Sequence, residues 1–275
     1  MSANAAVIIA RLGGKASWCG RLGDDARGRQ ILEGLHEENV DASAARILPG
    51  ASSPHSIVLV DSEGRRALVL HRPLFDDAQT DWLPLGEIDR VDAVLADNRW
   101  VPGARTLLQA ARARGVPAVL DADVGTGAET IEAVRAATHR FFSGAALAYL
   151  YGRPDPEEGL RQAARDCRFV SVTLGQEGAR WLDAHGAFCT QPAFPAAAVE
   201  TGGAGDIFHG AFTLALVETG DEVKAMRFAA AAAALKCSRA GGRASFPDRR
   251  SVEAFLQAHP TVDERASRGR RGGQR

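Results

Sequence analysis

The feature that most constrains the fold of this chain is an alternation of short apolar runs with longer amphipathic segments. Residues 94–96 and 118–120 are apolar runs with the length of buried strands, and residues 104–114 and 128–137 have a helical pattern. Repeated strand–helix units favour a parallel sheet, because a crossover helix returns the chain to the next strand. We therefore expect an α/β fold: a doubly wound, mostly parallel sheet with helices on both faces. Further strands are expected at 16–22, 57–60, 67–70, 141–142 and 168–173, and further helices at 4–11, 207–217, 223–237 and 251–258.

Polar side chains follow two of these strands at their carboxyl ends. Asp97 and Arg99 follow one run, and Asp121 and Asp123 follow the next. Ligands of open α/β sheets bind at this edge, so all four side chains are candidates for a binding site. Local alternatives are also open. Asp121 and Asp123 could cap the next helix, and Arg99 could pair with Asp97 at the surface.

A glycine-rich turn leads into the apolar segment at residues 207–217 and is expected to open a helix. The first turn of a helix attracts anions through its free amides, and glycines let an anion approach the backbone. Asp206 would repel a phosphate there, unless it accepts a proton from a hydroxyl that attacks a phosphoryl group. The anion hole would then consist of the amides of Gly203, Ala204 and Gly205. The alternative is an ordinary loop in which Asp206 caps the helix.

Three motifs resemble those of the PfkB, or ribokinase-like, carbohydrate kinases. The string Thr201-Gly202-Gly203-Ala204-Gly205-Asp206-Ile207-Phe208-His209-Gly210-Ala211 is similar to the family's C-terminal signature. Residues 20–28 resemble a family segment near the substrate, and residues 173–179 resemble one on the nucleotide side. The resemblance implies a kinase domain over residues 1–258. Residues 259–275 are rich in arginine and glycine, which predicts a disordered basic tail.

The resemblance implies ATP-dependent phosphorylation of a primary hydroxyl of a small sugar. It implies ATP and Mg²⁺ as cofactors, together with a monovalent cation such as K⁺ near residues 233–244, which resemble the family's adenine pocket. Asp206 would be the general base and would also contact the sugar. The other implied positions are Asn4 and Arg99 for the sugar, Asp123 for the metal, and Thr173, Gly175, Gly178, Cys237 and Gly241 for the nucleotide.

Within the family, residues 95–100, 120–123, 206–211 and 234–239 look most similar to bacterial 6-deoxy-6-sulfofructose kinases. In those kinases an arginine at the position of Arg99 binds the sulfonate, which suits a planar, permanently charged guanidinium. An asparagine that assists it is matched here by apolar Leu70. Another anionic ketose, or a neutral one, is therefore also compatible with the sequence.

Several positions depart from the family pattern. Glu200 stands where the family usually has aspartate, and Ser143 and Ala146 replace an Asn-x-x-Glu motif that serves the magnesium–phosphate network. The family's first strand and part of its small β lid precede the position of Asn4. We therefore expect an incomplete lid, an uncovered strand edge that favours aggregation, and stronger binding of ATP than of sugar. A catalytically silent nucleotide- or sugar-binding protein is the alternative, against which the intact residues 203–206 argue.

Composition excludes other classes of protein. The 275 residues are 45% hydrophobic and 24% charged with a net charge of −1, so no overall field favours nucleic acid or acidic membranes. The four cysteines are scattered, which favours reduced thiols, and no apolar run reaches the length of a membrane span. We expect a cytoplasmic enzyme with small-molecule partners, for which a homodimer is compatible. A NAD-binding Rossmann protein is disfavoured, because the glycine-rich turn lacks G-x-G-x-x-G.

Overall fold

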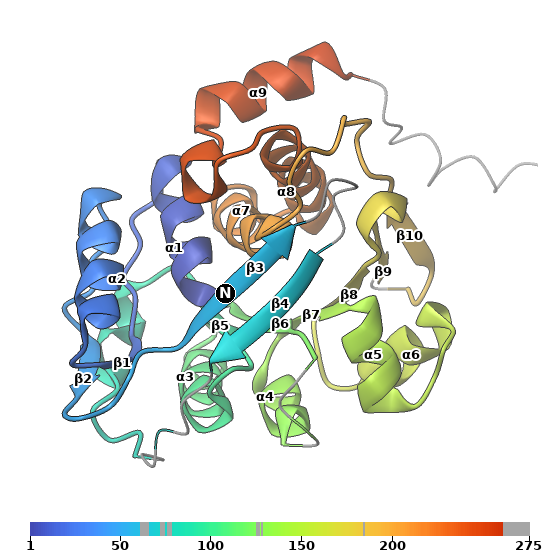
Figure 1. Cartoon of the computed structure of the whole chain (residues 1–275). Helices are drawn as coiled ribbons and strands as arrows, with labels where there is room; N and C mark the ends of the chain where they lie inside the picture. The colour runs from blue at the N-terminus through green and yellow to red at the C-terminus, as the bar shows by residue number, and fades with distance from the viewer. Residues whose placement is uncertain are drawn as a thin grey trace, which may run out of the picture.

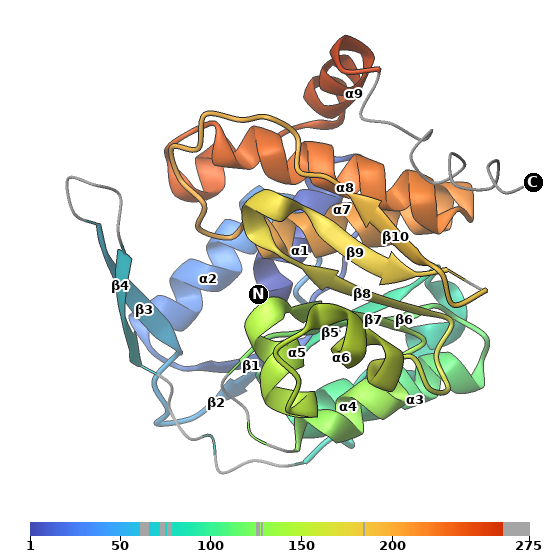
Figure 2. The same cartoon turned by 90° about the vertical axis from the view of Figure 1, so that its right-hand side faces the viewer.

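The computed structural model describes residues 1–60, 66–71, 75, 79–124, 127, 129–183 and 185–260. Residues 61–64 between two of the expected strands, Ala128 of an expected helix, and residues 261–275 of the expected tail lie outside the described residues. Figures 1 and 2 show the chain in two views.

The centre of the molecule is a six-stranded sheet with the order β10-β9-β8-β7-β6-β5 (Figure 1). Its parallel strands are β5 (Val94–Asp97), β6 (Ala118–Ala122), β7 (His139–Ser143) and β8 (Phe169–Thr173). The antiparallel strands are β9 (Ala179–Leu182) and β10 (Phe188–Gln191). Helix α3 (Val101–Ala113) joins β5 to β6, and α4 (Thr130–Ala136) joins β6 to β7. The expected mostly parallel α/β sheet is therefore confirmed.

Helices cover both faces of the sheet, as Figure 2 shows. One layer contains α3, α4, α5 (Gly144–Tyr151) and α6 (Pro156–Ala163), and the other contains α1 (Ser2–Arg11), α7 (Ala204–Thr219) and α8 (Glu222–Cys237). Neighbouring side chains of β7 pack against opposite helix layers. Phe141 lies in the hydrophobic core with α7 and α8, Phe142 lies in the core with α3–α6, and both are 0% exposed. Since successive side chains of a strand point to opposite faces, a strand covered on both sides must be apolar throughout.

Smaller elements lie beside this body. Strands β1 (Gly20–Gly23) and β2 (Ala45–Leu48) form a parallel pair. Strands β3 (His55–Val60) and β4 (Arg66–His71), expected at 57–60 and 67–70, form an antiparallel pair, the β3–β4 hairpin. Helix α2 (Ala26–Glu37) is capped by Asp25, whose carboxylate accepts a hydrogen bond from the Gly28 amide over 2.8 Å. The remaining elements are α9 (Arg249–Ala258) and short 3₁₀ turns at Leu85–Arg90, Gly175–Glu177 and Gly242–Ser245.

Strand β5 is the terminal strand on one side of the sheet, and in the described part of the chain β1 and β2 pair only with each other. The aggregation expected from an uncovered strand edge stays a prediction. No described helix combines the length and apolarity that a membrane span requires.

Candidate active site

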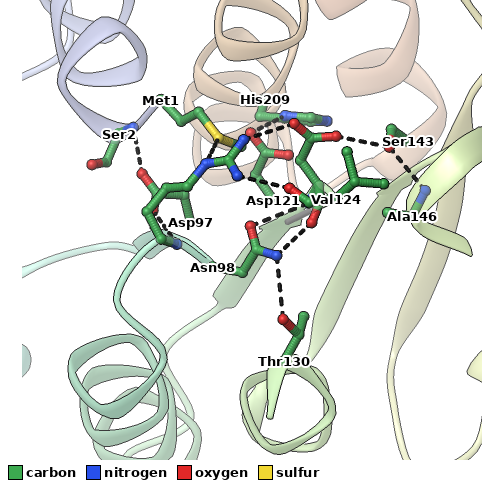
Figure 3. Close-up of polar contacts among 12 residues, drawn as sticks. Met1, Ser2, Asp97, Asn98, Asp121, Val124, Thr130, Ser143, Ala146 and His209 are labelled. Atoms are coloured by element: carbon green, nitrogen blue, oxygen red, sulfur yellow. Dashed lines mark hydrogen bonds and ion pairs between the residues drawn. The ribbon is translucent and has the colours of Figure 1, made fainter. Parts of the chain in front are cut away.

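The carboxyl ends of the parallel strands meet the beginnings of α1 and α7 at one edge of the sheet (Figure 3). The β5–β6 register places Asp97 beside Asp121, and the β7–β8 register places Ser143 beside Thr173. Figure 3 shows Asp97, Asp121, Ser143 and His209 converging on this edge. The edge predicted to bind ligands is therefore the one that gathers the predicted side chains.

The glycine-rich turn opens a helix, as predicted. Helix α7 begins at Ala204, after Gly203, whose φ of 77° and ψ of 3° favour glycine. The amide of Ala204 donates a hydrogen bond to the Thr201 carbonyl over 3.3 Å. In the described chain the amides of Gly203 and Gly205 donate to no protein acceptor, and Gly205 is exposed. Two of the three predicted anion-hole amides are thus available to a ligand.

Asp206 lies in the first turn of α7 and contacts α1. Its Oδ2 accepts a hydrogen bond from Nδ2 of Asn4 over 2.8 Å. Burial raises the pKa of the Asp206 carboxyl above its ordinary value, although the N-terminal ammonium and the Asn4 amide favour the charged form. A carboxylate with a raised pKa is a stronger base. The structure therefore brings together Asn4 and Asp206, both predicted to contact the sugar.

Close packing of α1 against α7 makes the contact between Asn4 and Asp206 achievable. A Cβ atom on Gly210 would lie 2.5 Å from Cγ2 of Ile8 and 2.7 Å from the carbonyl oxygen of Ala5. Glycine at position 210 thus lets α1 approach α7 closely enough for Asn4 to reach the carboxylate.

Arg99 and Asp123 form an ion pair across the site. Nη2 of Arg99 lies 2.8 Å from Oδ2 of Asp123, and Nη1 donates to the Val124 carbonyl over 2.7 Å. Asp97 accepts from the Arg99 backbone amide, so the predicted alternative of an Arg99–Asp97 side-chain pair is not observed. The other oxygen of Asp123 accepts from the Ser143 hydroxyl over 3.0 Å. Both carboxylate oxygens of the predicted metal ligand are therefore already engaged.

Two residues that sequence reasoning did not assign hold these loops in place. Asn98 is 0% exposed, and its side chain donates to the Asp123 carbonyl over 2.5 Å and accepts from the Asp123 amide over 3.2 Å. The Ser143 hydroxyl also accepts from the Ala146 amide over 3.1 Å, so it caps α5. Ser143, noted as a departure from the family motif, therefore has two structural partners.

A buried pair lies one helical turn beyond Asp206. Nδ1 of His209 is 2.9 Å from Oδ2 of Asp121, and their side chains are 4% and 10% exposed. The ring of Phe141 packs against His209 with centroids 5.1 Å apart. Asp121 was a candidate by its position after a strand, whereas its pairing with His209 could not be predicted, because the two residues lie on separate elements.

The predicted nucleotide-side residues lie in two places. Thr173, Gly175 and Gly178 lie at the turn of the antiparallel hairpin from β8 to β9. At Gly178, with a φ of 89°, a Cβ would lie 2.1 Å from the Gln191 carbonyl oxygen, so glycine has a structural role there.

Cys237 and Gly241 contact residues 199–200, which directly precede the glycine-rich turn. The Cys237 carbonyl accepts from the amides of Val199 and Glu200 over 2.8 and 3.2 Å. The Gly241 amide donates to Oε2 of Glu200 over 2.9 Å. The end of α8 is thereby linked to the segment that leads into α7.

A doubly wound α/β sheet with a carboxylate at an anion-attracting helix terminus is the arrangement that the resemblance to ribokinase-like sugar kinases led us to expect. The sequence profile of the pfkB family of carbohydrate kinases matches residues 2–249. The chain belongs to this family, and it is a sugar kinase, a phosphotransferase that binds ATP.

Individual relatives agree with this assignment. The chain is 29% identical over 273 residues to the ribokinase of Arabidopsis thaliana, covering 93% of this chain and 71% of the relative. It is 29% identical over 259 residues to the ribokinase of Bacillus subtilis, covering 92% and 86%. The structure of the Arabidopsis ribokinase with ribose and ATP superposes with a TM-score of 0.80 at 28% identity, covering 93% and 86%. A crystal structure from Agrobacterium tumefaciens, provisionally assigned as a ribokinase, superposes with a TM-score of 0.88 at 37% identity, covering 94% and 86%.

Proposed function

We propose that this protein transfers the γ-phosphoryl group of ATP to a primary hydroxyl of a small sugar, with Asp206 as the general base. One observation carries the proposal: a carboxylate with a raised pKa lies in the first turn of a helix whose Gly203 and Gly205 amides are available to a ligand. In a turn that only binds phosphate, a carboxylate at this point would repel the ligand. In a turn that also removes a proton from a hydroxyl beside the phosphoryl group, the carboxylate is the proton acceptor.

The chemistry follows from these positions. As the sugar oxygen forms its bond to the γ-phosphorus, its proton passes to a carboxylate oxygen of Asp206. The bond from the γ-phosphorus to the bridging oxygen breaks, and ADP leaves. The amides of Gly203 and Gly205 stabilise the charge on the transferring group, and Asn4 orients the carboxylate through its 2.8 Å hydrogen bond.

Mg²⁺ would supply charge neutralisation of the ATP phosphates. The described residues contain no group of three or more His, Cys, Asp or Glu side chains that could hold a metal ion. The Asp123 carboxylate is occupied by Arg99 and Ser143. These residues therefore do not fit a protein-built magnesium site as they stand. Mg²⁺ is commonly held largely by substrate phosphates and water, and we propose that it enters with ATP.

The nucleotide is proposed to bind between residues 237–241 and residues 173–178. Cys237 and Gly241 lie in the first of these segments and contact residues 199–200, which precede α7. Thr173, Gly175 and Gly178 lie on the other, beside Ser143 at the sheet edge. The relative whose structure contains ribose and ATP supports a nucleotide site in this fold.

Arg99 is proposed to hold an anionic group of the acceptor, such as a sulfonate or phosphate. It lies at the ligand-binding edge with 29% of its side chain exposed, and its guanidinium can bind an oxyanion through two N–H groups. A relative named ATP-dependent ribose-1-phosphate kinase, 29% identical over 256 residues, shows that anionic sugars occur among the substrates of similar proteins. The sulfofructose kinase assignment rests on sequence motifs alone.

We further propose that two copies associate through the β3–β4 hairpin. Ile57, Leu59 and Val69 are 57%, 57% and 58% exposed, and Val58 and Leu70 are both 48% exposed, so both faces present apolar side chains. Exposed apolar strands favour pairing with another chain. Sedimentation equilibrium should show a dimer that an Ile57→Lys variant weakens, and a monomeric wild type would contradict this proposal.

The direct test of the proposed function is ³¹P and ¹³C NMR of the product formed from ATP and a panel of pentoses, ketoses and their sulfonate and phosphate derivatives. The proposal expects a new phosphate ester on a primary carbon for at least one member. A protein that binds ATP yet phosphorylates none of them would support the silent binding protein instead.

A further inference from the structure

A fully buried lysine lies next to the glycine-rich turn. Lys236, in the last turn of α8, is 0% exposed. Its Nζ lies 3.2 Å from Oε1 of Glu200 and 3.4 Å from the carbonyl oxygen of the same residue. Burying an ammonium away from water costs free energy unless the charge is paired. The contacts of Lys236 with Glu200 must therefore be strongly favourable or have a role other than stability.

Both carboxylate oxygens of Glu200 have partners, and Oε1 is the one that faces Lys236. Its Oε2 accepts from the backbone amides of Gly241 and Gly242 over 2.9 and 3.1 Å. The Gly242 amide, together with Lys236 and Gly241, lowers the pKa of the Glu200 carboxyl below its ordinary value. Gly241 and Gly242 have φ angles of 118° and 55°, which favour glycine and turn both amides toward one anion.

This cluster fixes the turn that presents the catalytic groups. Glu200 is held by Lys236 and by the amides of Gly241 and Gly242, and the Cys237 carbonyl binds the amides of residues 199 and 200. Gly203 caps α7 three residues later. A displacement of Glu200 would therefore move the Gly203 and Gly205 amides and the carboxylate of Asp206.

The residues of this region do not fit the monovalent cation that the sequence led us to expect near residues 233–244. A K⁺ ion needs several free oxygen ligands, whereas both Glu200 oxygens and its carbonyl already receive hydrogen-bond donors. We propose that the Lys236 ammonium is a built-in cation that positions residues 200–206, so that this enzyme needs no K⁺. The expected effects on kcat rest on the proposed kinase function. The expected effects of cations on melting temperature and ATP affinity do not.

The first test uses the wild-type protein in potassium, sodium and choline chloride at equal ionic strength. Thermal melting temperature, ATP affinity by calorimetry and kcat should agree among the three salts, with kcat within about twofold. Specific stabilisation by K⁺, or a tenfold or greater loss of kcat without it, would overturn the inference. If no salt supports any turnover, the proposed function fails, and the melting temperature and ATP affinity still decide this inference.

The second test removes the ammonium. Lys236→Ala leaves space beside Glu200, whereas Lys236→Met fills that space without a charge. Lys236→Ala should lose kcat by about 10- to 100-fold, as expected for a misplaced catalytic group. Ammonium or methylammonium ions should restore the kcat of Lys236→Ala, but they should not restore the kcat of Lys236→Met. The same ions should raise the melting temperature of Lys236→Ala and of no other variant.

The matched control is Lys224→Ala, because Lys224 lies on the same helix with 67% of its side chain exposed. It should behave as wild type in every salt. A Lys236→Met variant with wild-type kcat, or a Lys236→Ala variant that small cations neither stabilise nor activate, would contradict the built-in cation.

Discussion

Replacing Gly210 by alanine tests whether the closeness of α1 and α7 sets the catalytic geometry. The added Cβ would lie 2.5 Å from Cγ2 of Ile8, 2.7 Å from the carbonyl oxygen of Ala5 and 3.2 Å from the Ala5 Cα. Carbon atoms pack best at about 3.5–4.0 Å, so α1 must move away by roughly 1 Å. The Ala5 contact is with backbone, which cannot rotate out of the way as a side chain can.

The magnitude follows from two opposing effects. Overpacking costs about 1–3 kcal/mol, and the upper end applies where backbone must move. Alanine gains about 1 kcal/mol over glycine within a helix. The net loss of roughly 2 kcal/mol should lower the melting temperature by about 4–8 °C in a protein of this size. A 1 Å movement of α1 would also lengthen the 2.8 Å hydrogen bond from Asn4 to Asp206, and kcat should fall by up to about 10²-fold.

Calorimetric melting and steady-state kinetics of Gly210→Ala measure both effects. The control is Gly86→Ala, because Gly86 has an ordinary φ and an added Cβ there meets nothing within 4 Å. The control should melt and turn over like wild type. The reasoning is refuted if Gly210→Ala melts within 1 °C of Gly86→Ala and keeps its kcat.

Three further predictions concern other parts of the site. Single substitutions of Asp121 or His209 by leucine should each cost about 3–5 kcal/mol in urea unfolding, and the double variant should cost less than their sum; strictly additive losses would show that the pair does not interact. Arg99→Ala should lower kcat/KM more for sulfonate- or phosphate-bearing sugars than for neutral ones, and an equal loss would remove Arg99 as the anion-binding residue. Since burial raises the pKa of Asp206, kcat/KM should fall as the pH drops through that raised value. The ionised carboxylate also destabilises the folded state, so stability should rise as the pH falls through this range, and an Asp206→Asn variant should lose that dependence.

The parallel sheet could be predicted because its strands are apolar on both faces, as Phe141 and Phe142 illustrate. Helices α5 and α6 were not predicted. The sequence of α5 is apolar on nearly every side, so it shows no helical period. Helix α6 is amphipathic, but its 8 residues are fewer than the window of about 11–18 residues in which such a period is read. Strand β2 has no fully buried residue, which removes the apolar signal of a strand.

The candidate site was predicted where the chemistry is local in sequence. The glycine-rich turn and Asp206 are contiguous, and the strand-end residues Arg99 and Asp123 follow a positional rule. The pairs Asp121–His209 and Glu200–Lys236 could not be predicted, since each joins side chains from separate elements. Glu200 was interpreted as a departure that weakens the case for activity, whereas its carboxylate binds Lys236 and two glycine amides.

The central claim is that Asp206 takes the proton of the attacking hydroxyl, and kcat of Asp206→Asn with ATP affinity measured alongside tests it most directly. Asp92→Asn is the matched control, because Asp92 is exposed and away from the site. The account predicts that Asp206→Asn loses about 10²–10⁴-fold in kcat while it binds ATP at least as tightly as wild type. Turnover within a few-fold of Asp92→Asn would contradict it.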